Sequence, residues 1–206
     1  PTHASYVARV RETAAALRSQ RWLTEADAAE IIAAAEAADT DSASPSGSVS
    51  PTMDCSAALK FARPGLTLDR VERVAAGHPP LADGSGAIDS AAPVVPEHCL
   101  VQGRVDPRIG HGGRPFAIGF DLRLPTQWNG RFAFHGGGGM DGRLVPAVGD
   151  IHRTLDPSAL ARGFAVISSD GGRRGAWTDS TFGQDQQARI DYAYNALEKI
   201  TLLGKQ

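Results

Sequence analysis

Apolar side chains recur at helical spacing in the first forty residues. The region 3–20 carries an apolar position every three or four residues, which predicts an amphipathic helix. This stripe consists of Tyr6, Val10, Ala14 and Leu17. A second helix is predicted to begin near Thr24, an N-cap residue with Asp27 three positions later, and to continue through an alanine-rich stretch. We therefore expect a helical hairpin over residues 1–40, followed by a linker over 41–54 that is rich in Ser, Pro and Gly.

The pattern changes to that of strands in the middle of the chain. Residues 55–100 contain short apolar pieces broken by Gly and Pro, which predict irregular structure. After them, PFAIGFDLRLP alternates between apolar and polar residues and predicts a half-buried antiparallel strand. Its apolar face holds Phe116, Ile118, Phe120, Leu122 and Leu124. Asp121 and Arg123 lie on the opposite face, which we expect to contact solvent. After a turn at PTQWNG, Arg131–His135 is predicted to return as a second strand.

The last third of the chain alternates helices and strands. DPSALARG predicts a short helix, with Asp156 as cap and Gly163 at its end, and FAVIS predicts a strand covered on both faces. Residues 185–206 predict a final helix with an apolar stripe. The stripe consists of Ile190, Tyr194, Leu197 and Thr201. This order indicates an α/β fold. Because a helix that leaves a parallel strand normally returns to the sheet, we expect a second polypeptide or cleavage product to complete it.

Composition excludes some classes of function and leaves the state of the cysteines open. The 206 residues are 42% hydrophobic and carry a formal net charge of −2, with no basic patch of the kind that binds nucleic acid. No apolar run approaches the roughly 18–20 residues of a membrane span. The chain begins at Pro1 without a methionine, so a leader peptide can have preceded it. Cys55 and Cys99 fit either two buried thiols or one disulfide.

The most unusual feature is a run of four glycines, Gly136–Gly139, directly after the strand Arg131–His135. Glycine loses much entropy on folding, so such a run suggests that the bare backbone is needed. One interpretation is a dinucleotide-binding loop, since Gly137, Gly139 and Gly142 match G-x-G-x-x-G. That motif must open a helix, whereas Pro146 and Gly149 follow here. A slack surface loop is the second interpretation.

The third interpretation is an oxyanion hole. A tetrahedral intermediate needs backbone N–H donors about 3 Å from its negative oxygen, where a side chain would obstruct the substrate. In α/β-hydrolases one donor comes from a loop after an early strand, and the other from the residue that follows the nucleophile.

Four stretches of the sequence resemble the tannase/feruloyl esterase family of α/β-hydrolases, which includes the mono(2-hydroxyethyl) terephthalate hydrolases. They are PEHCLVQGRV, GFDLRLPTQWNGRFAFHGGGG, ALARGFAVISSDGG and FGQDQQARIDYAYNALEKITLLGKQ, and together they span about Cys55 to Gln206. The resemblance implies that this chain is the N-terminal portion of an α/β-hydrolase fold with an added helical hairpin. The hairpin itself lies outside the resemblance.

The resemblance also implies roles for individual residues. The N–H of Gly139 would be an oxyanion donor, and Gly138 and Met140 would border the acyl pocket. Cys55 and Cys99 would form the family's N-terminal disulfide, which implies a secreted or periplasmic protein. Relatives often carry a histidine where this chain has Arg173, so the contacts of that loop are expected to differ.

The family's other catalytic parts are absent from this sequence. The nucleophile elbow G-C-S-x-G-G, the Asp and the His of the triad follow later in the family, and Ser168, Ser169 and Ser180 lie outside any G-x-S-x-G motif. No metal site is indicated, and no cofactor is expected in this chain; the family's calcium site, where a member has one, belongs to an absent lid. His135, His111 and His152 are interpreted as structural or loop residues.

The resulting hypothesis is the N-terminal chain of a serine carboxylic-ester hydrolase acting on galloyl, feruloyl or terephthalate-type esters. Its expected partners are a C-terminal chain carrying Ser, Asp and His and a small aromatic ester, with no nucleic acid and no membrane. Two alternatives stay open: a dinucleotide-binding oxidoreductase fragment that uses Gly137–Gly142, and a non-catalytic binding module that uses the hairpin.

Overall fold

The chain forms two compact units, Pro1–Ser48 and Val49–Gln206, and we describe each by itself. The computed structural model describes residues 3–21, 23–37, 55, 62–81, 87–149 and 157–206. The expected linker 41–54, as well as His152 and Asp156, therefore lies outside the described residues.

The first unit is the predicted helical hairpin. It consists of α1 (His3–Ser19) and α2 (Glu25–Ala37). The cap predicted at Thr24 is confirmed: its Oγ1 accepts a hydrogen bond from the backbone N–H of Asp27 at 3.1 Å, and its own N–H donates to the Asp27 carboxylate at 3.3 Å. Tyr6, placed on the predicted apolar stripe, is 41% exposed. None of the helices in the described residues is both long and apolar enough to span a bilayer.

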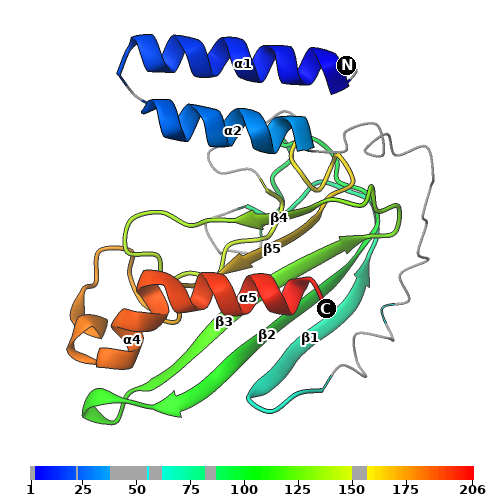
Figure 1. The fold of residues 1–206 in the computed structure, drawn as a ribbon. Helices are drawn as coiled ribbons and strands as arrows, with labels where there is room; N and C mark the ends of the chain where they lie inside the picture. Colours follow the sequence, from blue (N-terminus) through cyan, green and yellow to red (C-terminus); the bar gives the residue numbers. More distant parts are fainter. Residues whose placement is uncertain (1–2, 22, 38–54, 56–61, 82–86, 150–156) are drawn as a thin grey trace. The chain divides into compact units, whose positions relative to one another are not determined.

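The second unit is built on a five-stranded mixed sheet with the order β1-β2-β3-β5-β4 (Figure 1). Its strands are β1 (Leu66–Val74), β2 (His98–Ile109), β3 (Pro115–Pro125), β4 (Phe132–His135) and β5 (Ala165–Ser169). The pairs β1–β2, β2–β3 and β3–β5 are antiparallel, and the pair β4–β5 is parallel. The strand predicted at 131–135 is thus present, but β5 lies between it and β3.

One strand lies where irregular structure was expected, and a second begins there. β1 falls within residues 55–100, and β2 begins at His98, before the predicted start of the core. The predicted helix around 157–163 is also wrong, because these residues form turns. Here Ser158 accepts hydrogen bonds from Ala161 and Arg162, and the chain then enters β5.

One face of the sheet packs against α5 (Ala196–Gly204), which crosses it in Figure 1. The core on this face consists of Val101, Val105, Ile118, Phe120, Leu122, Ile167, Ala196, Ile200 and Leu203. A disulfide between Cys55 and Cys99 joins the start of β2 to the segment before β1, with 5.5 Å between the Cα atoms. The disulfide implied by the resemblance is therefore present. An apolar recess of about 430 Å³ opens on this face, lined among others by Phe120, Trp128, Phe132 and Leu203.

The opposite face of β3 is buried as well, so the prediction of a half-buried strand is wrong. Asp121 is 1% exposed and Arg123 is 4% exposed, because the segments around Ala147 and Leu160 cover them. Asp121 accepts hydrogen bonds from Arg123 and from the backbone N–H of Ala147, both at 3.0 Å. Burial of the two charges is tolerated because each one is paired and hydrogen-bonded.

His98 completes this buried network. Its Nδ1–H donates to the carbonyl of Pro96 at 2.7 Å, so its Nε2 accepts the hydrogen bond from Arg123 at 3.0 Å. Burial lowers the pKa of His98, and the neighbouring Arg123 charge acts in the same direction. The neutral tautomer therefore fits the contacts on both sides of the ring.

The last helix contains a π-helical turn that shifts its buried face. It runs through α4 (Gln186–Ile190), η3 (Asp191–Asn195), which is π-helical, and α5. The buried positions are Ala188, Asp191, Ala196, Ile200 and Leu203, with a step of five between Asp191 and Ala196. The stripe predicted from a uniform helix is therefore wrong, and two of its members, Tyr194 and Leu197, are 60% and 54% exposed.

Candidate functional site

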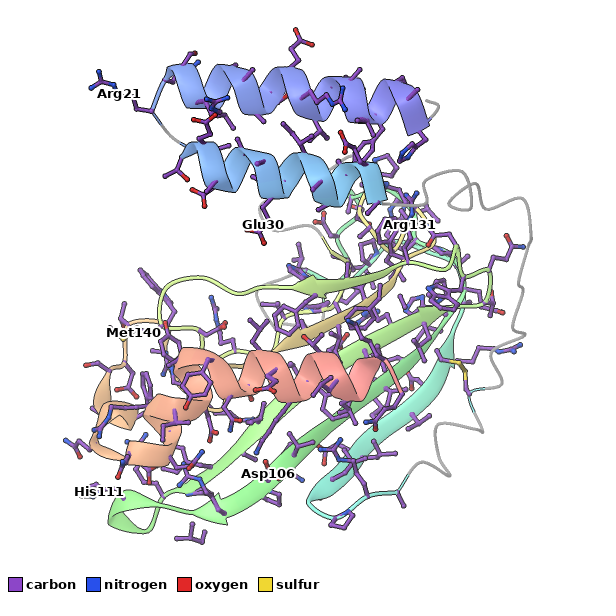
Figure 2. The ribbon with its side chains drawn as sticks, viewed as in Figure 1. Arg21, Glu30, Asp106, His111, Arg131 and Met140 are labelled. Carbon is purple, nitrogen blue, oxygen red and sulfur yellow. A yellow bond between two sulfur atoms is a disulfide. The ribbon has the colours of Figure 1, made fainter. Side chains whose placement is uncertain are left out.

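The glycine loop leaves β4 and turns sharply at Gly139. Gly139 has φ +61° and Asp141 has φ +54°, and the N–H of Asp141 donates to the carbonyl of Gly138 at 3.0 Å. Gly139 suits this left-handed position because it has no Cβ, which would lie 3.0 Å from the ring of Trp177. Figure 2 shows Met140 on this loop, near the α4 end of the last helix. Gly138, Gly139 and Met140 are all exposed to solvent.

The peptide group between Gly139 and Met140 is held at both ends. The hydroxyl of Tyr192 donates to the carbonyl of Gly139 at 2.9 Å, and the N–H of Met140 donates to the carbonyl of Trp177 at 3.0 Å. Among the described residues the structure gives the N–H of Gly139 no acceptor. In the described part of the chain, the exposed N–H of Gly139 thus has no acceptor, as is also true of Gly137 and Gly138, and it lies directly before a peptide group that is fixed in orientation.

Arg173 holds the loop from the inside. Its guanidinium group is buried, with 2% of the residue exposed, and donates to the carbonyls of Met140 at 2.5 Å and Asp141 at 3.1 Å. It also donates to the carbonyl of Ala176 at 2.9 Å and lies 4.7 Å from the centre of the Phe182 ring. Arg173 therefore links the Phe182 ring to the main chain of the glycine loop.

Two carboxyl groups with raised pKa values lie at the base of the loop. Burial, and after it the nearby carboxylate of Asp170, raise the pKa of Asp141 to about 6 against the opposing effect of Arg173. Burial also raises the pKa of Asp170, although its Oδ1 accepts hydrogen bonds from the N–H groups of Gly119 at 2.9 Å and Gly172 at 3.0 Å. The base of the loop is thus an electrostatically coupled cluster rather than an inert turn.

The family model described as tannase and feruloyl esterase matches residues 99–206, which include the sheet from β2 onwards, the glycine loop and the last helix. The chain belongs to the tannase and feruloyl esterase family. The resemblance predicted from the sequence is therefore confirmed.

Individual relatives agree with this membership. The chain is 44% identical over 130 residues to a mono(2-hydroxyethyl) terephthalate hydrolase from Piscinibacter sakaiensis, a match that covers 60% of this chain and 21% of that protein. It is 36% identical over 86 residues to a probable feruloyl esterase B-2 from Aspergillus flavus, covering 42% of this chain and 15% of that protein. The chain spans about a fifth of the length of the curated relatives that it matches.

Solved structures match the second unit. A crystal structure of feruloyl esterase B from Aspergillus oryzae aligns with a TM-score of 0.54 at 25% identity, covering 72% of this chain and 26% of that chain. An esterase from Aspergillus oryzae aligns with a TM-score of 0.52 at 22% identity over 72% of this chain and 27% of that chain, which shows the shared fold alone. The predicted α/β fold, the N-terminal portion of an esterase of the α/β-hydrolase type, is confirmed.

The structure does not provide the helix that the dinucleotide-binding alternative requires after the glycine loop. A pyrophosphate-binding glycine motif must lead into a helix whose N-terminus faces the phosphates. No helix occurs in residues 136–149, which follow β4 as turns and irregular backbone. The hairpin alternative stays a prediction, since nothing in the structure tests it.

The histidines and serines singled out in the sequence have structural roles where the structure describes them. His135 is 5% exposed, and its Nδ1 accepts a hydrogen bond from the N–H of Gly149 at 3.3 Å. The hydroxyl of Ser168 donates to the carbonyl of Val145 at 2.5 Å, and that of Ser169 donates to the carbonyl of Gly119 at 3.0 Å. Both serines are buried, and neither is arranged as a nucleophile.

Sequence reasoning missed the groups that hold the loop. Trp177 and Tyr192 reach Gly139 and Met140 from more than thirty positions away, and no local pattern marks such contacts. The departure from histidine at Arg173 was the one available signal. In the described part of the chain, no group of three or more His, Cys, Asp or Glu side chains is arranged to hold a metal ion.

Proposed function

We propose that this chain supplies one half of the oxyanion hole of a serine carboxylic-ester hydrolase, through the backbone N–H of Gly139. The observation that carries the proposal is the exposed N–H of Gly139, which has no acceptor among the described residues and precedes a peptide group fixed by Tyr192 and Trp177. A fixed donor stabilises the negative oxygen of a tetrahedral intermediate without reorganising during the reaction. One such donor is worth about 3–4 kcal/mol of transition-state stabilisation.

The nucleophile and its base are proposed to come from a C-terminal companion, which also covers the apolar recess beside Leu203. Support comes from the relatives, which are about five times as long as the matched region. The side chains of His135, Ser168 and Ser169 are engaged in hydrogen bonds within the fold. The companion would attack the ester carbonyl with its serine, form an acyl-enzyme and release the acid with water.

The proposed substrates are small esters of aromatic acids, of the galloyl, feruloyl or terephthalate type. Two relatives, a mono(2-hydroxyethyl) terephthalate hydrolase and a probable feruloyl esterase B-2, support this class. Gly138 and Met140 are proposed to border the acyl group, since both are exposed beside the free N–H. Trp177, which is 58% exposed and lies against Gly139, offers an aromatic surface at the same place.

We also propose that the protein works outside the cytoplasm and needs no cofactor in this chain. The disulfide between Cys55 and Cys99 supports export, because disulfides persist in oxidising compartments. Oxyanion stabilisation by backbone N–H groups and attack by a serine need no metal or organic cofactor in these residues.

A serine-directed fluorophosphonate probe tests the proposal on the complete protein, with this chain and its companion together. The expected result is one labelled serine in a G-x-S-x-G peptide of the companion, with loss of hydrolysis of methyl ferulate, methyl gallate and mono(2-hydroxyethyl) terephthalate. Label on Ser168, Ser169 or Ser180, or a wild-type protein that hydrolyses none of these esters, would overturn it.

A matched pair of glycine variants tests the role of Gly139 itself. Gly139→Ala places a Cβ against Trp177 at a left-handed position, and we expect kcat to fall by about 10² with little change in KM. Gly113→Ala has the same backbone constraint, with φ +73°, but its Cβ would point into open space away from the loop. It should retain wild-type kcat, so equal losses in both variants would contradict the assignment.

A further inference from the structure

Tyr192 connects the last helix to the glycine loop. Its hydroxyl donates to the carbonyl of Gly139 at 2.9 Å, although the two residues are 53 positions apart. The acceptor carbonyl belongs to the peptide group directly after the N–H of Gly139. The N–H of Gly139 belongs to the preceding peptide group, whose carbonyl, that of Gly138, accepts from the N–H of Asp141 at 3.0 Å. A hydrogen bond to the carbonyl of Gly139 fixes the following plane, and so it restricts the backbone torsions of Gly139 that relate the two planes and set the direction of its N–H.

The π-helical turn places Tyr192 at this position. Asp191 is 6% exposed at the start of the turn, and its Oδ1 accepts hydrogen bonds from Gln187 at 2.9 Å and Asn195 at 2.6 Å. These contacts reach four residues back and four residues forward, so they span the turn on both sides. π-helical turns inside α-helices are frequent at functional sites because they redirect side chains. Here the redirected side chain is Tyr192.

The ring of Tyr192 is held in place as well as its hydroxyl. It packs against Phe182, with 5.1 Å between ring centres, and Phe182 lies beneath the guanidinium group of Arg173. Arg173 in turn donates to the carbonyl of Met140. Tyr192, Phe182 and Arg173 thus form a continuous path of contacts that begins and ends on the glycine loop.

We infer that Tyr192 is a positioning residue for the oxyanion donor, acting through the carbonyl of Gly139. The inference rests on the proposed function, because it assigns Tyr192 to the orientation of the same N–H. Tyr192 does not need to touch the reacting atoms: its hydroxyl holds the peptide group that follows Gly139, which restricts the backbone of Gly139, and the N–H of Gly139 meets the substrate. Arg173 shares this task but is deeply buried, so its removal would disturb the fold, whereas Tyr192 is 38% exposed and can lose its hydroxyl without losing its packing.

The test compares Tyr192→Phe with Tyr194→Phe in the complete protein. Tyr194 lies on the same π-helical turn and is 60% exposed, and its hydroxyl makes no hydrogen bond to the loop among the described residues, so it is a matched control for loss of a tyrosine hydroxyl. For Tyr192→Phe we expect about tenfold faster amide hydrogen exchange at Met140 and about a three- to tenfold lower kcat at unchanged KM. Tyr194→Phe should match the wild type in both measurements.

The outcomes separate this inference from the proposed function. Wild-type protein that hydrolyses the aromatic esters, together with a Tyr192→Phe variant of equal kcat, overturns the inference and leaves the proposed function standing. Wild-type protein that hydrolyses no ester overturns the proposed function itself. A purely structural role for Tyr192 would lower the melting temperature while kcat per titrated active site stayed at the wild-type value, which also overturns the inference.

Discussion

The main chain of Gly137 packs directly against the carboxyl group of Asp141, and this contact leaves no space for a Cβ atom at residue 137. Gly137 and Asp141 flank the residues proposed to face the substrate, so the contact defines the width of the turn. The neighbouring Gly138 has open space where its Cβ would be. Two adjacent glycines of one run therefore have different structural requirements.

Gly137→Ala is expected to destabilise the protein by about 1–3 kcal/mol, because the new methyl group must displace the carboxyl group of Asp141. Gly138→Ala should change the free energy of unfolding by less than about 0.5 kcal/mol. Urea denaturation of both variants checks this difference. Equal stabilities of the two variants would contradict the packing of Gly137 against Asp141.

Asp141 is expected to make folding depend on pH. Its carboxyl group ionises near 3.8 when unfolded and near 6 when folded, so between these values the folded state binds more protons. The free energy of unfolding should therefore fall as the pH rises from about 4 to about 6. Two pKa units correspond to about 3 kcal/mol, and because solvent screens this half-exposed side chain we expect about 1 kcal/mol.

Asp141→Asn removes this titration and keeps a side chain that tolerates the left-handed backbone at φ +54°. Its free energy of unfolding should fall less steeply between pH 4 and pH 6 than that of the wild type. The gain in stability of the variant over the wild type should be largest at pH 7. Parallel wild-type and variant curves across this range would show that Asp141 is not responsible.

Arg123→Met should cost about 3–5 kcal/mol of stability, because it leaves the carboxylate of Asp121 charged and buried without its main partner. Arg104→Met is the matched control: Arg104 pairs with Asp69 at 2.8 Å, but both side chains are about 40% exposed. The control should lose less than about 1 kcal/mol. Guanidinium denaturation measures both, and similar losses would argue against burial as the cause.

Reduction of the disulfide between Cys55 and Cys99 should destabilise the second unit. The bond joins residues separated by 44 positions, which corresponds to about 4 kcal/mol in the chain-entropy model. Thermal unfolding with and without dithiothreitol measures the loss. A Cys55→Ser/Cys99→Ala variant should melt at the temperature of the reduced wild type and should not respond to the reductant.

Local patterns predicted the elements whose stability is decided locally. The cap at Thr24 and Asp27, the antiparallel strand at β3 and the apolar run of β5 each depend on neighbours in the sequence, and each is confirmed. The resemblance supplied the candidate Gly139, which no periodicity identifies.

The failed predictions concern contacts made over long distances in the sequence. Asp121 and Arg123 look solvent-exposed by alternation, but a later segment carrying Ala147 covers them. The extra residue of the π-helical turn moves the buried stripe away from Tyr194, and no helical period includes such an insertion. The orientation of Gly139 depends on Tyr192 for the same reason, since tertiary contacts determine it.

The strand order has a consequence for synthesis on the ribosome. The glycine loop emerges before β5, which must insert between β3 and β4, and before Trp177 and Tyr192, which hold the Gly139–Met140 peptide. A nascent chain that ends short of Tyr192 therefore contains the glycines but lacks the groups that shape them. The loop acquires its geometry only when the last helix docks, which makes this docking the maturation step of the site.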